Sequence, residues 1–342
     1  MKCVIYYKKG DINEAVSYYM SIMERAFNNY FRVVTRTSNI DGIDSDEVVA
    51  VISHRCFWDV LKKNRKQKII FWWQGVAPEE IIFGQKKMSL YLRIKYLYLC
   101  GLEYLFLRYS SLNLFVSESM LRHYKTKYGY KKDNYIIMPC FNQKINEDSF
   151  RYPNKYVKPS FVYAGGIQPW QCIDEALQLY AMVKLKYPDA SMTLLTKDEE
   201  LAQKLITKHS LADVTIKFVA LENLNNELAK YKYGMLLRSD DPVNNVATPT
   251  KFNSYLAVGS IPIISRTIGD YGRVTERMKY VICVKDENDL QAAFDQIDCI
   301  EQQKIFPEAV LAEYKEIFNY YYNEDHYIEL ITEKLKIFFQ FD

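Results

Sequence analysis

The chain has 342 residues, of which 49% are hydrophobic and 25% are charged, and its formal net charge is +3. This is the composition of an ordinary globular protein; the length suits two domains, and so small a net charge does not argue for nucleic-acid binding. The seven cysteines are scattered without a CxxC pair, and the four histidines form no ligand cluster. We therefore expect reduced thiols in a cytoplasmic protein, with no disulfide framework and no metal site. No signal peptide precedes the first expected strand, and no apolar run reaches the ~18 residues that a membrane span needs.

Short β-rich runs alternate with longer helical runs along the whole chain. This alternation is typical of parallel sheets with helical crossovers, so the sequence predicts an α/β fold with two doubly wound domains in tandem. The expected strands of the first half are Lys2–Tyr7, Phe31–Thr35, Val48–Ile52, Lys68–Trp72, Leu112–Val116 and Tyr135–Met138. Those of the second half are Ser160–Tyr163, Ser191–Thr196, Thr215–Val219, Gly234–Leu237, Ile261–Ile264 and Val281–Val284. Helices are expected between them, among others at Glu14–Phe27, Glu118–Tyr128, Ile173–Lys186 and Glu199–His209.

The stretch NQKINEDSFRYPNKYVKPS separates the two halves and has the polar, proline-containing composition of a linker. It predicts domains at 1–145 and 156–320. Ligands of such sheets bind at the carboxyl ends of the strands, and two domains that face each other form a cleft there. The tail contains two consecutive helices without a strand between them. Either they cap the second sheet, or the last helix, 321–342, crosses back to brace the first domain, which is the arrangement we adopt.

The stretch NNVATPTKFNSYLAVGSIPIIS predicts a short helix followed by a buried strand. Thr248 is expected to be the N-cap, Pro249 the first helical residue and Gly259 the residue that closes the helix. The helix start around Thr250 exposes unpaired N–H groups, and Lys251 adds a full charge in the first turn. A cation is unfavourable for helix stability at this end, but it is well placed to hold an anion. The alternative is a surface lysine whose ammonium group reaches into solvent.

A second stretch, SFVYAGGIQPWQCIDEALQLY, follows the same logic. It runs from a strand through Gly165 and Gly166 into a helix expected to begin near Trp170. Two glycines let backbone N–H groups approach a phosphate closely. Arg238 directly follows the strand GMLL and is a third basic candidate, with a salt bridge to one of the next two aspartates as the alternative. Three such features at the carboxyl ends of strands favour a diphosphate ligand.

The second half resembles the donor domain of GT-B glycosyltransferases, most closely that of glycosyltransferase family 4. PTKFNSYLAVGSIPII matches the family's PTKxxEYLAxGxPVI stretch, and FVYAGGIQPWQCIDEAL resembles its first donor-domain strand and turn. LNLFVSESMLRHYKTKYGYKKDNYIIMPCFN resembles the segment that closes the acceptor domain. The resemblance implies two Rossmann-like domains facing a cleft, a nucleotide-sugar donor and a glycan acceptor. It also implies transfer with retention of configuration, no cofactor and no essential metal.

The sequence departs from this family at residues that grip the donor. The family's E-x7-E pair falls on Val246 and Ser254, so a bidentate carboxylate grip on the ribose is missing. The basic residues that follow the first donor-domain glycine are also absent, and we expect Arg238 and Lys251 to neutralise the diphosphate and act in catalysis. The WWQGVAPEE loop stands where some members have an acceptor-side histidine, which makes Gln74 and Glu79 the acceptor-side candidates. The candidate donor-binding residues are Gly165, Gly166, Trp170, Val219, Thr248, Thr250 and Ser254.

Residues 86–132 are strongly basic and are opposed only by Glu103 and Glu118. Between the charges lies LYLRIKYLYLCGLEYLFLRY, rich in Leu and Tyr. A basic, aromatic helix suits an anionic membrane surface and a lipid-linked acceptor, whereas the alternative is a core helix with a solvated edge. No nucleic-acid motif accompanies the charge. The basic residues are Lys86, Lys87, Arg93, Lys95, Arg108, Arg122, Lys125, Lys127, Lys131 and Lys132.

The sequence thus favours an enzyme that adds sugars to a glycan, here a lipid-linked one in surface polysaccharide assembly, in the cytoplasm or on the inner face of the membrane. The lost Glu pair keeps open a catalytically inactive nucleotide-sugar-binding or scaffold protein of the same fold. A nucleotide-sugar epimerase is a further alternative. A metal-dependent GT-A transferase using Asp240 and Asp241 is disfavoured, because the spacing is wrong and the first half of the chain would remain unexplained.

Overall fold

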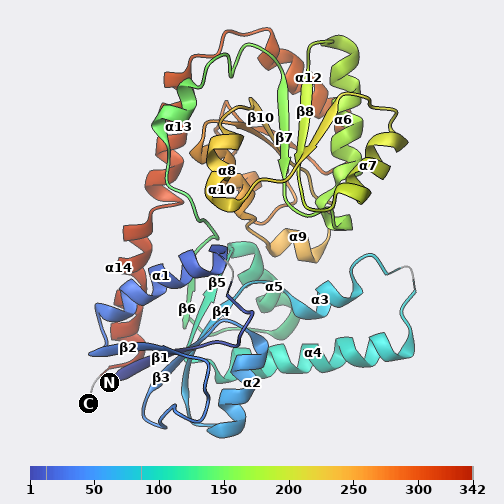
Figure 1. The fold of residues 1–342 in the computed structure, drawn as a ribbon. Coiled ribbons are helices and arrows are strands. Elements are labelled where there is room, and N and C mark those ends of the chain that lie inside the picture. The colour runs from blue at the N-terminus through green and yellow to red at the C-terminus, as the bar shows by residue number, and fades with distance from the viewer. Residues whose placement is uncertain (13, 86, 341–342) are drawn as a thin grey trace. The chain divides into compact units, whose positions relative to one another are not determined.

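The computed structural model describes residues 1–12, 14–85 and 87–340 (Figure 1). Lys86, one of the basic residues of the expected membrane segment, lies outside the described residues. The chain forms two compact units. Unit 1 comprises Met1–Asn142, Val246–Thr248 and Asn323–Asp342, and unit 2 comprises Gln143–Asn245 and Pro249–Tyr322.

Unit 1 is built on a six-stranded sheet in the order β2-β1-β3-β4-β5-β6, with every pairing parallel. Its strands are β1 (Lys2–Tyr6), β2 (Val33–Thr37), β3 (Val48–Val51), β4 (Lys68–Trp73), β5 (Leu112–Phe115) and β6 (Tyr135–Ile137). Its helices are α1 (Glu14–Asn28), α2 (His54–Lys63), α3 (Ala77–Ile82), α4 (Leu90–Tyr109), α5 (Glu118–Tyr128) and α14 (Glu324–Phe338).

Unit 2 repeats this architecture with the strand order β12-β11-β10-β7-β8-β9, again parallel throughout. Its strands are β7 (Ser160–Ala164), β8 (Ser191–Leu195), β9 (Val214–Lys217), β10 (Tyr233–Leu236), β11 (Ile261–Ser265) and β12 (Ile282–Val284). Its helices are η1 (Glu147–Arg151), η2 (Pro169–Gln171), α6 (Ile173–Lys186), α7 (Glu199–Lys208), α8 (Leu221–Leu228), α9 (Pro242–Val246), α10 (Thr250–Ala257), α11 (Tyr271–Val274), α12 (Leu290–Glu301) and α13 (Pro307–Tyr320).

The central strands of both sheets are continuous apolar runs. β3 (VVAV) and β11 (IPIIS) are buried at every position. A strand that is buried on both faces needs helices on both faces of its sheet, which is the doubly wound arrangement predicted from the alternating pattern. The fold class expected from the sequence is therefore confirmed.

The strand order changes direction once in each sheet. In unit 1 the reversal lies between β1 and β3, and in unit 2 it lies between β7 and β10. Loops that leave such neighbouring strands at their carboxyl ends diverge and open a crevice, where ligands of doubly wound sheets bind. The residues that follow β1, β3, β7 and β10 are therefore the places to examine for function.

The tail consists of two helices, as the sequence predicts, and they belong to different units. α13 packs against η1, whereas α14 packs against α1; Figure 1 shows α14, in red, alongside α1, in blue. Tyr18 donates to the Glu324 carboxylate at 3.1 Å, and Arg25 forms an ion pair with the same carboxylate. The last helix thus returns to the first domain.

The segment expected to be a linker is packed into unit 2. It contains η1, whose Phe150 is buried, and the Asn146 N–H donates to the Ala257 carbonyl at 2.7 Å. Lys155 is also buried, and its ammonium group donates to the Val258 carbonyl. Its polar composition therefore reflects hydrogen bonding to the end of α10 and not solvent exposure. Of the helices within the described residues, none is both long and apolar enough to cross a membrane.

Candidate functional site

A candidate anion site lies at the strand reversal of unit 2. β7 and β10 are neighbours in the sheet, and Gly165 and Arg238 follow them at their carboxyl ends. α10, which begins at Thr250, brings Lys251 to the same place, because the Lys251 ammonium group donates to the Gln171 side chain at 2.8 Å. The three features that the sequence singled out thus meet at one edge of the sheet.

Arg238 is a buried cation, 4% exposed. Its backbone N–H donates to the Ser265 hydroxyl at 2.9 Å, and its guanidinium donates to the Trp170 carbonyl at 3.1 Å. Burial lowers the pKa of this guanidinium. The salt bridge considered from the sequence does not form: the Asp240 carboxylate accepts from the Asn245 amide, and that of Asp241 from the Val243 N–H.

Lys251 faces the same space from the first turn of α10. Its ammonium nitrogen lies 5.0 Å from the centroid of the Tyr163 ring, in a cation–π contact. Burial, together with the positive charge of Arg238, lowers the pKa of Lys251 well below its ordinary value. The Tyr163 hydroxyl donates towards the Gly166 carbonyl and the Gln171 side chain, and so it fixes the floor on which Lys251 rests.

Within the described part of the chain, neither Arg238 nor Lys251 forms an ion pair with a carboxylate. Two neighbouring cations therefore share a partly buried site without compensation. Such a pair is unfavourable in the empty protein, since burial disfavours charge and like charges repel each other. An anion bound between them would relieve both effects, and phosphate oxygens suit the donors of Arg and Lys.

Gly165 is required by the geometry of this site. Its φ of +138° lies in the region that L side chains rarely adopt, and a Cβ atom there would come within 2.7 Å of Lys251 Cε. The glycine therefore leaves the space that the lysine side chain fills. Gly166, the other glycine of the predicted phosphate turn, supplies the carbonyl that accepts from Tyr163.

The predicted start of α10 is wrong by two residues. The helix begins at Thr250 with Pro249 as its N-cap residue, and no side chain caps it. Thr248 is buried and belongs to unit 1, where its hydroxyl accepts from the Cys140 N–H at 3.0 Å and donates to the Val116 carbonyl at 3.3 Å. These bonds to the backbone of unit 1 replace the predicted cap. The closing residue was predicted correctly, since Gly259 follows the helix with a φ of +80°.

The other donor-side candidates occupy different settings. The helix predicted near Trp170 starts at Ile173, because the short turn η2 intervenes, and Trp170 is half-buried there. Ser254 is buried, and its hydroxyl donates back to the Thr250 carbonyl at 3.1 Å. Val219 follows β9, at the far edge of the sheet from β10, and is half-buried.

A second candidate site is a cavity of about 280 Å³ at the strand reversal of unit 1. Asp11, after β1, accepts from the Ser53 hydroxyl at 3.0 Å and from Arg55 at 2.9 Å, and these hydrogen bonds and charges lower the pKa of its carboxyl against the opposing effect of burial. Gln74, after β4, donates to the Ile52 carbonyl at 2.8 Å. The cavity is lined by Asp11, Ile52, Ser53, His54, Phe71, Trp72, Gln74, Gly75, Ala77 and Glu80.

Two ring nitrogens at this cavity have no partner. Nε2 of His54 and Nε1 of Trp72 are buried without a hydrogen bond among the described residues. Burial lowers the pKa of His54 to about 4, so its ring is neutral at neutral pH. No Lys or Arg lines the cavity within the described residues. An ionised carboxylate, a neutral imidazole, an amide and an indole N–H together suit a ligand that carries hydroxyl groups and no negative charge.

Glu79, the other acceptor-side candidate, does not line this cavity among the described residues; its neighbour Glu80 does. The Glu79 carboxylate forms an ion pair with Lys127 at 2.6 Å and lies 3.3 Å from the His123 ring. These partners lower its pKa although burial opposes them. Glu79 is thus part of a buried charge cluster beside α5.

Several residues of both sites were not predicted. Tyr163 and Gln171 support Lys251, and Asp11, His54 and Trp72 line the cavity of unit 1. Asp11 and His54 share a signal that could have identified them, because each is a polar residue shortly after an apolar strand that borders the strand reversal. Tyr163 carries no such signal, since an aromatic residue at the end of a buried strand is usually a core residue.

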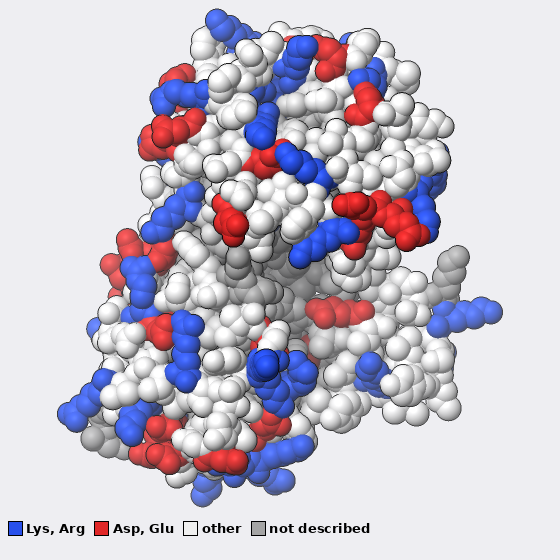
Figure 2. All heavy atoms as spheres, in the orientation of Figure 1, with Lys and Arg blue, Asp and Glu red and all other residues white. Residues whose placement is uncertain are grey.

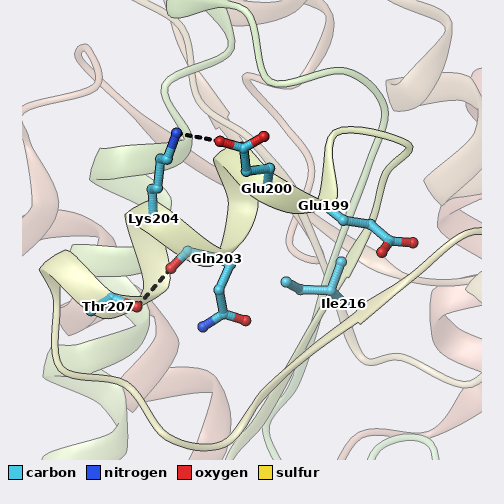
Figure 3. A pocket seen from close by; sticks show the side chains of 6 residues that line it. All are labelled: Glu199, Glu200, Gln203, Lys204, Thr207 and Ile216. Atoms are coloured by element: carbon cyan, nitrogen blue, oxygen red, sulfur yellow. Dashed lines mark hydrogen bonds and ion pairs between the residues drawn. The ribbon is translucent and has the colours of Figure 1, made fainter.

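A shallow surface hollow of about 630 Å³ lies between α7 and β9 in unit 2 (Figure 3). Its charged side chains neutralise each other, as Lys204 pairs with Glu200 at 2.5 Å. The Thr207 hydroxyl donates to the carbonyl of Gln203 within the same helix. This hollow therefore lacks the uncompensated charge that distinguishes the anion site.

No family model and no curated protein matches the chain in sequence. Solved structures do match it in fold. Sucrose-phosphate synthase from Thermosynechococcus elongatus aligns over 99% of both chains at 11% identity, with a TM-score of 0.72. An E. coli trehalose-6-phosphate protein bound with UDP-2-fluoro glucose aligns over 100% of both chains at 10% identity, with a TM-score of 0.67.

S. aureus TarM, in a complex with fondaparinux, alpha-GlcNAc-glycerol and UDP, has 12% identity and a TM-score of 0.64 over 87% of the present chain, which spans 56% of TarM. These structures are GT-B glycosyltransferases. Their likeness excludes the GT-A alternative built on the two aspartates after Arg238, because a single-sheet architecture does not produce two six-stranded parallel sheets. The chain has the GT-B fold.

Proposed function

We propose that the protein is a glycosyltransferase that moves a sugar from a nucleoside diphosphate sugar, bound by unit 2, to a hydroxyl group of a glycan acceptor. The observation that carries this proposal is the pair of cations without carboxylate partners, Arg238 and Lys251, at the strand reversal of unit 2. Fixed positive charge at this position stabilises the charge that develops on the leaving diphosphate. The fold shared with enzymes solved with UDP or UDP-2-fluoro glucose supports the same ligand class.

The acceptor side of the proposal rests on the cavity of unit 1. Its ionised Asp11, neutral His54 and absence of lining cations among the described residues favour a hydroxyl-rich acceptor without a phosphate at the reacting end. Membership of glycosyltransferase family 4, retention of configuration, independence of metal and a lipid-linked acceptor in cytoplasmic polysaccharide assembly are the finer parts of the proposal. They rest on the resemblance of the sequence motifs.

The first test measures UDP binding by calorimetry to the wild-type protein and to Lys251→Met. This substitution keeps most of the side-chain volume beside Gly165 and removes the charge. Charge-assisted hydrogen bonds to phosphate are worth about 1.5–3 kcal/mol, so we expect the affinity for UDP to fall roughly ten- to a hundredfold. Lys204→Met, in the surface hollow of the same unit, is the matched control and should bind UDP like the wild type.

The same measurement is repeated with GDP and ADP to identify the base. An unchanged affinity of Lys251→Met for every nucleoside diphosphate that the wild type binds would show that the lysine does not contact the diphosphate. If the wild type binds none of them, the proposed donor class is wrong.

A second candidate function is a nucleotide-sugar-binding protein that does not transfer sugar. It is favoured by Ser254, which stands where the resembled family has a carboxylate and whose hydroxyl is bonded to its own helix. Turnover separates the two candidates: a panel of nucleotide sugars is incubated with the protein and free diphosphate is measured, with and without glycan acceptors. Release of diphosphate that Lys251→Met reduces supports the transferase. Binding without release in the presence of glycan acceptors supports the second candidate.

A further inference from the structure

One helix of unit 1 exposes an unusual amount of apolar surface. In α4, Leu90 and Leu97 are 75% and 68% exposed, and tyrosines and an isoleucine lie between and beyond them. Contiguous apolar surface of this kind on a folded protein marks a binding surface, whereas scattered single residues do not. The exposed apolar residues of α4, here called the α4 face, are Leu90, Tyr91, Ile94, Leu97, Tyr98, Tyr104 and Tyr109.

The α4 face is separate from the side by which the helix joins the unit. Phe106 and Leu107 are buried near the carboxyl end, where the Phe106 ring stacks on Phe57 of α2 at 4.3 Å. Leu90, Ile94 and Leu97 follow the i, i+4, i+7 spacing of a single helical side, opposite these buried residues. Packing in unit 1 therefore explains only one of the two apolar sides of α4.

The charges beside the α4 face are all positive. Arg93, Lys95 and Arg108 are exposed, as is Lys87 before the helix, and among the described residues none of them forms an ion pair. The acidic residue of α4, Glu103, is fully buried. In Figure 2 the region that corresponds to α4 is largely white with isolated charged side chains. The surface thus combines apolar and aromatic contact with uncompensated positive charge.

Not every basic residue of the 86–132 segment contributes to this surface. Lys127 pairs with Glu79 in the buried charge cluster. Lys132 donates to the Arg108 carbonyl at 2.6 Å and so satisfies the carboxyl end of α4. These two lysines have structural partners, which leaves the cations around the α4 face as the functional part of the segment.

We propose that the α4 face binds the surface of a membrane that contains anionic lipid. Exposed Leu and Ile side chains enter the boundary between headgroups and acyl chains, tyrosines occupy the headgroup level, and the flanking cations bind lipid phosphates. A second copy of the chain fits less well, because a two-fold contact through this face brings Arg93 and Lys95 close to their own like charges.

The test is co-sedimentation with vesicles of phosphatidylcholine mixed with phosphatidylglycerol, and with vesicles of phosphatidylcholine alone. We expect binding to the anionic vesicles only, and strong weakening at about 1 M salt, where the Debye length is about 3 Å. The charge variant R93Q/K95Q should lose about 30-fold in partitioning, since each basic residue near an anionic surface contributes about 1 kcal/mol. The matched control R65Q/K66Q removes two exposed cations of unit 1 outside the segment and should bind like the wild type.

The apolar contribution is tested with Leu97→Ser, which should lose at least about tenfold in partitioning. Its control is Leu185→Ser, which removes an equally exposed leucine from α6 of unit 2. The proposal is overturned if the wild type does not sediment with anionic vesicles at low salt, or if test and control variants behave alike. It is also overturned if sedimentation velocity shows a dimer that Leu97→Ser disrupts. The test uses no nucleotide, so its outcome is independent of the proposed function.

Discussion

Lys251 shows how a single residue can oppose folding and still be useful. Its pKa is lower in the folded protein than in the unfolded chain, because burial and Arg238 both disfavour the ammonium form. Between these two pKa values the unfolded chain holds more protons than the folded protein, so stability rises with pH through this window. At pH values below the window both states are protonated, and the full penalty is present.

The pH dependence of stability therefore tests the environment of Lys251 without any ligand. We expect Lys251→Met to melt at the same temperature as the wild type or higher at neutral pH, because it removes the penalty. The difference should shrink as the pH approaches the ordinary value of a lysine and the wild type loses its unfavourable charge. Calorimetric melting curves of both proteins across this range are the measurement. A variant that melts lower at every pH would show that the lysine stabilises the fold.

How far residues could be identified from sequence depended on what they contact. Lys251 and Arg238 were found because a cation at a helix start or directly after an apolar strand is unusual in itself. Thr248 was misassigned, because its position before a proline is typical of an N-cap, yet its hydroxyl bonds to backbone atoms of Cys140 and Val116, more than a hundred residues away. Such long-range partners leave no local signal in the chain.

At the scale of elements, Glu103 connects three helices of unit 1. Its carboxylate accepts from the Ala77 N–H at 3.1 Å, at the start of α3, where the N-cap residue provides no side-chain bond. It also accepts from the Tyr128 hydroxyl of α5 at 2.7 Å. Burial raises the pKa of Glu103 to about 7, although these bonds and Lys127 oppose the shift.

This raised pKa predicts a specific pH effect on stability. Between the ordinary value of 4.5 and about 7 the folded protein holds more protons than the unfolded chain, so the contribution of Glu103 to stability falls as the pH rises through this window. Glu103→Gln keeps an acceptor for the Ala77 N–H and removes the titration. We expect the variant to gain about 1–3 kcal/mol relative to the wild type between about pH 5 and about pH 8. Parallel melting temperatures at the two pH values would contradict this.

Element boundaries were predictable where the capping chemistry is local. The helix expected at Glu118–Tyr128 is found with these bounds, because the Ser117 hydroxyl accepts from the Met120 N–H and Gly129 closes the helix in the left-handed conformation. The helix expected from Trp170 was displaced because a proline permits a short turn before α6, and Cys172 then adopts a φ of +51° that no propensity predicts.

At the scale of the whole molecule, the last helix completes the first unit. Ile331 and Leu335 of α14 are fully buried, and the Thr332 hydroxyl bonds to the Ala26 carbonyl of α1. Ile331→Ala and Leu335→Ala should each cost about 2–5 kcal/mol, since they remove buried side chains from a packed contact. The control on the same helix is Ile337→Ala, whose side chain is 58% exposed and should change stability little.

The intrinsic fluorescence shows which unit responds to these substitutions. Three of the four tryptophans belong to unit 1, and the Trp72 ring stacks on Tyr19 of α1 at 3.9 Å. Loss of α14 packing should therefore lower the temperature of the main fluorescence transition. A shift equal to that of Ile337→Ala would mean that α14 is peripheral to unit 1.

The architecture of the chain was predictable from its pattern, whereas the path of the chain between units was not. Twelve apolar runs separated by helical periodicity define two parallel sheets. In contrast, Val246–Thr248 belongs to unit 1 although α9 and α10 on either side of it belong mainly to unit 2. This brief return depends on hydrogen bonds such as that from Ser117 to the Val246 carbonyl, which no short stretch of sequence encodes.

The uncompensated cations of unit 2 also have a consequence for the history of this sequence. Replacing Lys251 by a neutral residue relieves electrostatic repulsion in the empty protein, so mutation alone would tend to remove it. A lineage that no longer met a phosphorylated ligand would lose nothing by such a change and would become easier to fold. The persistence of both charges is therefore expected only while an anion occupies the site often enough to offset their repulsion. The pair thus records recent selection for binding, whether or not transfer has been retained.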